Sequence, residues 1–101
     1  MLAHSDFVFP IFTVQGNELV AFARVLSDRV CKALIFDVIV APGHRDQGLG
    51  QRLVDRIVRH PELERVKHFE LYCLPDLTAF YERWGFSMDV GGVALMRRVL
   101  R

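Results

Sequence analysis

The sequence has few cysteines, no long apolar run and no excess of one charge, and each shortage removes a class of protein. Cys31 and Cys73 are the two cysteines among 101 residues, too few for a disulfide scaffold and not spaced as metal ligands. The longest apolar stretches, such as residues 38–41, are far too short to span a bilayer. With 13 basic and 12 acidic residues, the net charge of +1 offers no electrostatic footprint for nucleic acid and no polybasic patch for a membrane.

Length and composition predict one domain. The 101 residues leave no room for a second, so we expect a single domain over residues 1–101. Residues 1–6 lack a basic region followed by an apolar stretch, which predicts no secretory signal. Together with two free thiols, this favours a cytoplasmic protein. The 51% of hydrophobic residues argue against disorder and predict that a second copy of the chain covers part of the surface.

Hydrophobic periodicity predicts an α+β domain with a mixed, mostly antiparallel sheet and two main helices. The expected order is β-β-β-α-β-α-β-β, with strands over residues 7–14, 19–26, 33–40 and 66–73, a closing hairpin of 86–89 and 93–99, and helices over 48–59 and 76–84. The third strand is almost entirely apolar, which predicts a central strand covered on both faces. In the second helix, Asp76 is the expected N-cap and Gly85 the C-terminal glycine.

The loop between the third strand and the first helix carries the strongest chemical signal. Residues 40–50 read Val-Ala-Pro-Gly-His-Arg-Asp-Gln-Gly-Leu-Gly, so glycines lead directly into a helix N-terminus. Such a terminus has free N–H groups and the positive end of the helix dipole, which suit a phosphate. No Gly-Lys-Ser/Thr follows, and Leu53 stands where a dinucleotide fingerprint needs its third glycine. The alternative is a structural connection that happens to contain two glycines.

Two motifs together resemble those of the GNAT superfamily of N-acetyltransferases. The first is the coenzyme motif Arg/Gln-x-x-Gly-x-Gly/Ala, matched by Arg45-Asp46-Gln47-Gly48-Leu49-Gly50 and preceded by Val40-x-Pro42. The second, aromatic-Tyr-Glu-basic-x-Gly-Phe, is matched by Phe80-Tyr81-Glu82-Arg83-Trp84-Gly85-Phe86. The likeness runs from about Phe9 to Val99, and it implies a single GNAT-like domain that binds acyl-coenzyme A.

The resemblance implies acetyl-coenzyme A as co-substrate and implies no metal. The pantetheine arm of the coenzyme is expected to add like a strand to the backbone at Val38, Ile39 and Val40. The pyrophosphate is expected on the N–H groups of the glycine loop, which are those of Arg45, Asp46, Gln47, Gly48, Leu49, Gly50 and Gln51. The Arg45 side chain is expected to add a charged contact, and the alternative for it is a solvated loop arginine. His44, in the same loop, is expected to be solvated.

The resemblance makes Tyr81 the candidate catalytic acid. Acyl transfer to an amine expels a thiolate, and a phenol beside that sulfur can donate a hydrogen bond or a proton to it. Ordinary pKa values are about 10 for tyrosine and about 8.5 for a thiol, so full proton transfer is uphill and a hydrogen bond is the safer role. The alternative is that Tyr81 packs, as the neighbouring Phe80 and Trp84 are expected to do.

Asp37 is the candidate base, because a carboxylate inside an apolar strand needs either a partner or a role. The alternative is a structural carboxylate paired with a neighbour. Leu34 stands where other family members carry a glutamate, which leaves the identity of the base open. Cys73, near the end of the fourth strand, is expected to be a buried structural thiol rather than a covalent relay.

Typical members of the superfamily begin with a strand and two helices that form one wall of the acceptor pocket, whereas this chain begins with the hairpin near Phe7. We therefore expect an N-terminally truncated fold with an open acceptor side and uncovered sheet surface. A homodimer is the expected cover, because the first strand carries Phe7, Phe9 and Phe12 on both faces. The alternative is a monomer in which residues 1–6 fold over the sheet.

Three functions are compatible with these motifs. The resemblance implies an N-acetyltransferase that moves the acetyl group of acetyl-coenzyme A to a primary amine by direct attack. The alternative is a non-catalytic acyl-coenzyme A-binding module or regulatory subunit, which the open acceptor side favours. A nucleotide-binding domain unrelated to acetyl transfer is disfavoured by the second motif. The sequence does not name the acceptor.

Overall fold

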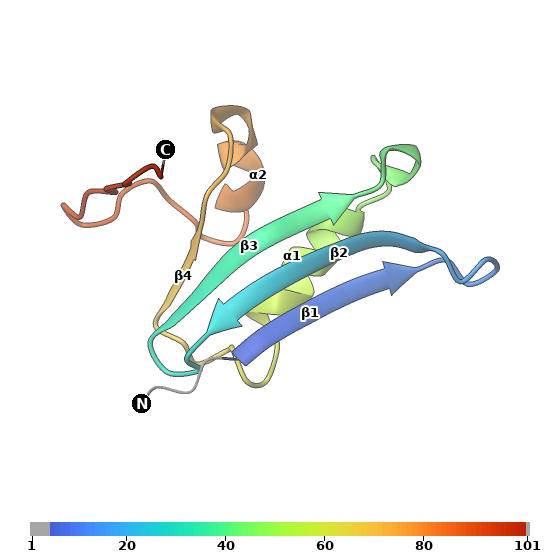
Figure 1. The fold of residues 1–101 in the computed structure, drawn as a ribbon, viewed down its shortest axis with the longest axis horizontal. Coiled ribbons are helices and arrows are strands. Elements are labelled where there is room, and N and C mark those ends of the chain that lie inside the picture. The colour runs from blue at the N-terminus through green and yellow to red at the C-terminus, as the bar shows by residue number, and fades with distance from the viewer. Residues whose placement is uncertain (1–4, 101) are drawn as a thin grey trace.

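In the computed structural model, residues 5–100 are described, and they form a four-stranded sheet with one long helix packed across it (Figure 1). The elements are β1 (Ser5–Phe12), β2 (Leu19–Ser27), β3 (Lys32–Val40), the 3-10 turn η1 (Pro42–His44), α1 (Leu49–Val58), β4 (His68–Leu71), the 3-10 turn η2 (Pro75–Leu77) and α2 (Thr78–Glu82). The strand order is β1-β2-β3-β4; the first three strands are antiparallel and β4 joins β3 in parallel. The predicted α+β fold with a mixed, mostly antiparallel sheet is confirmed.

The core lies between α1 and one face of the sheet. Apolar residues recur along α1 at helical spacing, so that Leu49, Leu53 and Ile57 fall on one side and are buried. Facing them, the strands present small side chains, including Ala23 and Ala33, both fully buried. Small residues let the helix approach the sheet closely. The predicted first helix is therefore confirmed to within one residue at each end.

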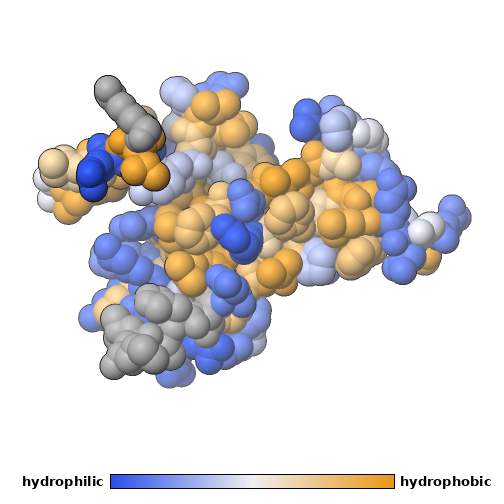
Figure 2. Space-filling view, in the orientation of Figure 1, coloured by the Kyte–Doolittle hydropathy of each residue, from blue (hydrophilic) through white to orange (hydrophobic). Residues whose placement is uncertain are grey.

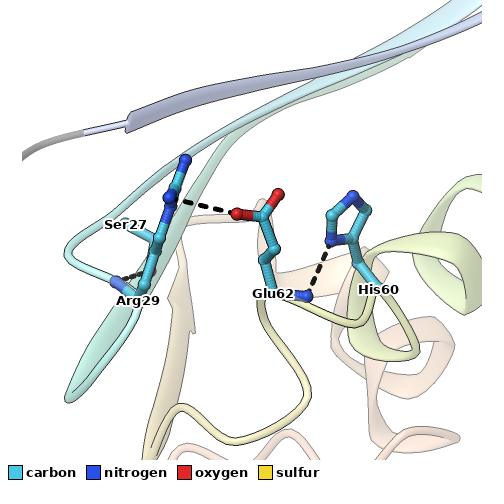
Figure 3. Close-up of polar contacts among 4 residues, drawn as sticks. All are labelled: Ser27, Arg29, His60 and Glu62. Atoms are coloured by element: carbon cyan, nitrogen blue, oxygen red, sulfur yellow. Dashed lines mark hydrogen bonds and ion pairs between the residues drawn. The ribbon is translucent and has the colours of Figure 1, made fainter.

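The turn after β2 and the loop after α1 are joined by polar contacts (Figure 3). The Ser27 hydroxyl accepts a hydrogen bond from the Arg29 N–H at 2.9 Å, and the Arg29 guanidinium pairs with Glu62 at 3.1 Å. The Glu62 N–H donates to His60 Nδ1 at 3.1 Å, and the His60 ring packs edge-on against Phe7 with centroids 5.2 Å apart. These contacts hold the chain between α1 and β4 against the far end of the sheet.

A β-bulge interrupts the pairing of β2 with β3. Asp37 lies opposite Arg24, yet Ile35 lies opposite Val25, so Phe36 has no partner on β2. An extra residue of this kind bends the strand and raises its local twist. The bulge also shifts by one residue the alternation of side chains between the two faces of the sheet.

The bulge changes which residues of β3 reach the core. Ala33 and Ile35 are buried before it, whereas Val38 and Val40 pack against the same core after it. The pairing of β3 with β4 ends at Ile35 and Leu71, where the bulge begins. Beyond that point the two strands diverge (Figure 1).

The prediction that β3 is covered on both faces is wrong for the part of the chain that the structure describes. Phe36 is 45% and Ile39 47% exposed, because α1 covers one face and no described element covers the other. Apolar side chains accordingly gather over the strands in the space-filling view, with a few hydrophilic residues among them (Figure 2). On β1, Phe7 and Phe9 are buried but Phe12 is exposed. The alternative cover, residues 1–6, falls mostly outside the described residues, since 1–4 are not described.

The predicted closing hairpin is also wrong. The turn at Gly91-Gly92 is present, with both φ angles positive, but residues 86–100 contain no strand. The hydrogen bonds of this segment are local, as in the Asp89 N–H donating to the Ser87 hydroxyl at 2.9 Å. Its apolar side chains, such as Met96, are exposed. A strand needs a partner, and in the described residues this segment does not pair with the outer edge of β4.

The remaining differences concern the ends of elements. β1 begins and ends two residues earlier than predicted, and β4 is shorter than the predicted strand over residues 66–73. The second helix begins with the 3-10 turn η2, and Asp76 lies inside that turn without capping a helix through its side chain. Gly85 has φ +87° and follows the helix, as predicted for a C-terminal glycine. Within residues 5–100 no helix is long and apolar enough to cross a bilayer.

The packing of α1 yields a test of stability. Leu53 is 0% exposed, and Leu53→Ala should lower the free energy of unfolding by about 2–5 kcal/mol, from lost burial and the cavity left behind. The matched control is Arg52→Ala, on the exposed side of the same helix, which should change stability by less than about 0.5 kcal/mol. Denaturant unfolding measures both values. Equal effects of the two substitutions would contradict the position assigned to α1.

Candidate active site

The loop between β3 and α1 is shaped by two residues in the left-handed backbone region. Asp46 has φ 66° and Gly48, the N-cap of α1, has φ 75°. The left-handed conformation costs glycine nothing but costs other residues roughly 1–2 kcal/mol. Alternation of left-handed and other conformations turns successive N–H groups to one side, which makes a concave site for an anion.

The N–H groups of residues 48–51, at the start of α1, have no acceptor within the described part of the chain. The first backbone bond of α1 runs from the Arg52 N–H to the Gly48 carbonyl at 3.1 Å, and no side chain caps the helix. N–H groups of a helix N-terminus that lack a partner bind anions well, since the helix dipole adds its positive end. The predicted pyrophosphate loop therefore has the donors that such a group needs.

The side chains of the loop divide between the core and solvent. Leu49 is buried under the sheet, so its N–H group is the part available to a ligand. Arg45, Asp46, Gln47 and Gln51 are exposed. Arg45 Nε donates a hydrogen bond to the Val40 carbonyl at 3.3 Å, which places this guanidinium beside the end of β3.

Beyond the bulge, the edge of β3 that faces away from β2 is open. The Ala41 N–H donates to the Val20 carbonyl at 2.8 Å, which fixes the pairing phase of the antiparallel ladder. Because backbone groups alternate along such a ladder, Ile39 also points its groups to β2, whereas Val38 and Val40 point theirs to the opposite edge. β4 no longer pairs with that edge, so in the described residues the backbone groups of Val38 and the N–H of Val40 are free there, while the Val40 carbonyl accepts the Arg45 Nε hydrogen bond. Ile39 contributes neither its backbone groups nor its side chain to this edge.

Tyr81 lies on α2 and faces a small cavity of about 80 Å³ beside the end of β4. The cavity is lined by Leu71, Cys73, Thr78, Tyr81, Glu82, Phe86, Ser87 and Met88. Burial, and after it the nearby Cys73 thiol, raise the pKa of Tyr81 above its ordinary value of 10.0. The phenol therefore keeps its proton at neutral pH. Cys73 itself is half-buried rather than enclosed in the core.

Asp37 is not the buried carboxylate that its apolar strand predicts. Its side chain is 41% exposed and pairs with Arg24 on β2 at 3.8 Å. Arg24 also lies over the Phe36 ring, 4.8 Å from the centroid. The bulge is the reason, since it turns Asp37 to the uncovered face of the sheet while Val38 takes the core side. Asp37 thus lies on the sheet face opposite α1, whereas Tyr81 lies on α2, beside the cavity at the end of β4.

The structure adds a polar link between the two helices that the sequence did not indicate. Trp84 Nε1 donates to Asp55 Oδ1 at 2.7 Å, across 29 residues of sequence. Asp55 belongs to the polar side of α1, and Trp84 reads as a packing residue, so no local pattern pairs them. A second depression, open and about 500 Å³, lies at the other end of α1 near His60 and Pro61, away from the glycine loop.

Comparisons with known proteins agree with this geometry. The model of the acetyltransferase (GNAT) family matches residues 2–86. A GCN5-related N-acetyltransferase 1 of Arabidopsis thaliana is 32% identical over 91% of this chain and 47% of its own length. Serotonin N-acetyltransferase 2 of Oryza sativa subsp. japonica is 37% identical over 95% of this chain and 50% of its own. The chain therefore spans about half the length of these relatives.

A solved structure shows the same arrangement of elements. The crystal structure of a GNAT-family protein from Xanthomonas campestris pv. campestris superimposes with a TM-score of 0.83 at 35% identity. The superposition covers 94% of this chain and 65% of that protein.

The glycine loop yields a test of binding. Gly48→Val should abolish coenzyme A binding measured by calorimetry. A β-branched side chain disfavours φ 75°, and it would cover the N–H groups that bind the phosphates. Gly91 has a similar φ of 69° but lies in the C-terminal segment, so Gly91→Val controls for strain. It should leave coenzyme affinity unchanged. Wild-type affinity in Gly48→Val would refute the assignment of this loop.

Proposed function

This chain belongs to the acetyltransferase (GNAT) family, and on that premise we propose that it transfers the acetyl group of acetyl-coenzyme A to a primary amine by direct attack. One observation carries the proposal. The N–H groups of residues 48–51, which have no acceptor in the described residues, follow closely on the open backbone edge of β3 at Val38 and Val40. A pyrophosphate next to an amide-containing arm is the ligand chemistry that this pair of features fits.

The coenzyme is held by backbone groups in this proposal. The N–H groups of the glycine loop donate hydrogen bonds to the pyrophosphate oxygens, and backbone groups of Val38 and Val40 bind the amides of the pantetheine arm as an added strand would. Arg45 occupies the Val40 carbonyl at 3.3 Å, so its guanidinium must turn aside for the arm and is then free to approach the phosphates. No metal ion is needed for these contacts.

Tyr81 stabilises the departing thiolate. As the amine nitrogen bonds to the carbonyl carbon, the carbon–sulfur bond breaks and negative charge develops on sulfur. A phenol with a raised pKa stays protonated and donates a hydrogen bond there. The same raised pKa makes complete transfer of the proton less favourable, so the hydrogen bond is the role we assign.

Asp37 is the candidate that takes a proton from the ammonium group of the acceptor, directly or through water, so that the neutral amine can attack the thioester. Its exposure and its place on the sheet face opposite α1 suit an acceptor that arrives from the uncovered side of the sheet. The ion pair with Arg24 at 3.8 Å equally suits a structural role. If Asp37 is purely structural, another residue acts as the base.

The acceptor is a primary amine whose identity is open. The rice relative is named a serotonin N-acetyltransferase, and that name supports an amine acceptor for this chain. The alternative is a non-catalytic acyl-coenzyme A-binding module or regulatory subunit. A screen of amines that reads thiol release from acetyl-coenzyme A separates the two.

We further propose a cytoplasmic location, on the two free cysteines.

We also propose a homodimer that covers the sheet face opposite α1. That face carries Val8, Phe36 and Ile39, which are 60%, 45% and 47% exposed. Arg24 and Asp37 form an ion pair within it. Because the pair has both signs, a second copy rotated by 180° can present opposite charges at the same place. Apolar surface of this kind is commonly covered by a partner.

Removal of the Tyr81 hydroxyl tests the catalytic proposal. A hydrogen bond to a charged group contributes about 1.5–3 kcal/mol, so Tyr81→Phe should lower kcat roughly 10- to 150-fold. Coenzyme affinity should stay the same, because the contact strengthens in the transition state. Tyr72→Phe, at the other tyrosine of the chain, is the matched control. A wild-type kcat in Tyr81→Phe would show that Tyr81 has a packing role and no catalytic one.

Light scattering tests the dimer. The wild-type chain should show twice the 11.6 kDa mass of one chain at micromolar concentration. Val8→Lys should shift it to the monomer, since a charge would be buried in the interface. Met96→Lys, an equal change in the exposed C-terminal segment, should not. A wild-type mass of one chain that does not rise with concentration would refute the dimer.

A further inference from the structure

We infer that Asp55 and Trp84 are positioning residues that set where Tyr81 stands relative to the glycine loop. The inference rests on the proposed function for the role of Tyr81. It goes beyond that function by assigning a task to a link between α1 and α2 outside the coenzyme site.

The helix that carries Tyr81 is weakly held by packing. α2 is five residues long, has no side-chain cap and contributes no residue to the buried core. Isolated helices of this length are unstable, so tertiary contacts must keep its position. Burial supplies few of those contacts, which gives the remaining ones more influence over the placement of α2.

Three contacts connect α1 to α2 and to the turn that follows α2. A Cβ placed on Gly50 would lie 3.5 Å from the Phe80 ring, so the ring packs on the backbone of the glycine loop. The link between Arg83 and Gln51 is long, at 3.5 Å, and exposed. The Trp84 bond to Asp55 is short, at 2.7 Å, and partly buried, so it is the strongest of the three.

The Trp84 side chain is connected to Tyr81 through edge-to-face contacts between aromatic rings. Trp84 packs against Phe80 with centroids 5.0 Å apart, and Phe80 packs edge-on against Tyr81 at 5.0 Å. In the described residues, Asp55 has no ion pair, although Arg56 and Arg59 are near it on the same helix. The Asp55 carboxylate is therefore available to accept the hydrogen bond from the Trp84 indole. Loss of this bond should release the ring stack and move the Tyr81 hydroxyl from the thioester.

Kinetics provide the first test. Asp55→Leu and Trp84→Phe each remove one side of the bond and should lower kcat roughly 10- to 100-fold, as expected for a misplaced catalytic group. Coenzyme affinity should stay unchanged, because the glycine loop is intact. Asp55→Asn keeps an acceptor oxygen for the indole N–H, so it should retain most of the kcat that Asp55→Leu loses. Arg56→Leu, the adjacent exposed position, is the matched control for a leucine on this helix.

Combination with Tyr81→Phe separates positioning from general stability. If Asp55 acts through Tyr81, then Asp55→Leu should cause little further loss of kcat in the Tyr81→Phe background. If the two losses multiply, Asp55 acts by another route and the inference is wrong. The Asp55→Leu and Trp84→Phe losses should likewise not multiply, since each removes the same bond.

A second readout needs no acetyl transfer. In a Tyr72→Phe background, Tyr81 is the one tyrosine, and its ring carbons can be followed by NMR as the pH is raised. Burial keeps the pKa of Tyr81 above 10.0, so Asp55→Leu should lower that pKa toward 10.0 while Asp55→Asn retains it. An unchanged Tyr81 titration in Asp55→Leu would overturn the inference. If Asp55→Leu shifts the Tyr81 titration but the wild-type protein transfers no acetyl group, the proposed function is contradicted and the positioning of Tyr81 by Asp55 is not.

Discussion

The bulge at Phe36 is the constraint on which the site depends. A strand inside a sheet normally uses its backbone groups on both edges, and β3 does so as far as Ile35. One extra residue then bends the strand, and β4 no longer follows it. Pairing with β2 resumes at once, so β3 keeps its direction and stability while one edge stays open. The same residue turns Val38 to the core and Asp37 to the uncovered face, which fixes the side from which each could act.

The glycine loop derives its position from the core rather than from contacts of its own. Leu49 and Leu53 hold α1 against the sheet, and the fully buried Ala23 and Ala33 leave room for the helix to lie close. The first turn of α1 is therefore fixed at the end of β3 before any ligand is considered. This arrangement explains why N–H groups with no internal acceptor are tolerated there, because the burial of the helix face offsets the cost of leaving them to solvent or ligand.

The sequence predicted the features that depend on local chemistry. Glycine spacing located the loop that leads into α1, and the helical period of Leu49, Leu53 and Ile57 located α1 itself. It did not predict the bulge, because an apolar run without alternation looks the same whether or not its faces switch, and so it placed Asp37 in the core. The closing hairpin failed for a related reason. The Gly91-Gly92 turn formed as its composition indicates, but strand pairing depends on a distant partner that local pattern does not contain.

The two halves of the site are held by different forces, and this difference bears on how the site works. The coenzyme half depends on buried apolar contacts, which are insensitive to changes of a single surface group. The half that carries Tyr81 depends on ring stacking and on the bond from Trp84 to Asp55. A hydrogen bond constrains direction more narrowly than an apolar contact does, and a hydroxyl that must reach one sulfur atom needs such direction. Under the proposed function, affinity for the coenzyme and alignment of Tyr81 are thus separable properties of the site.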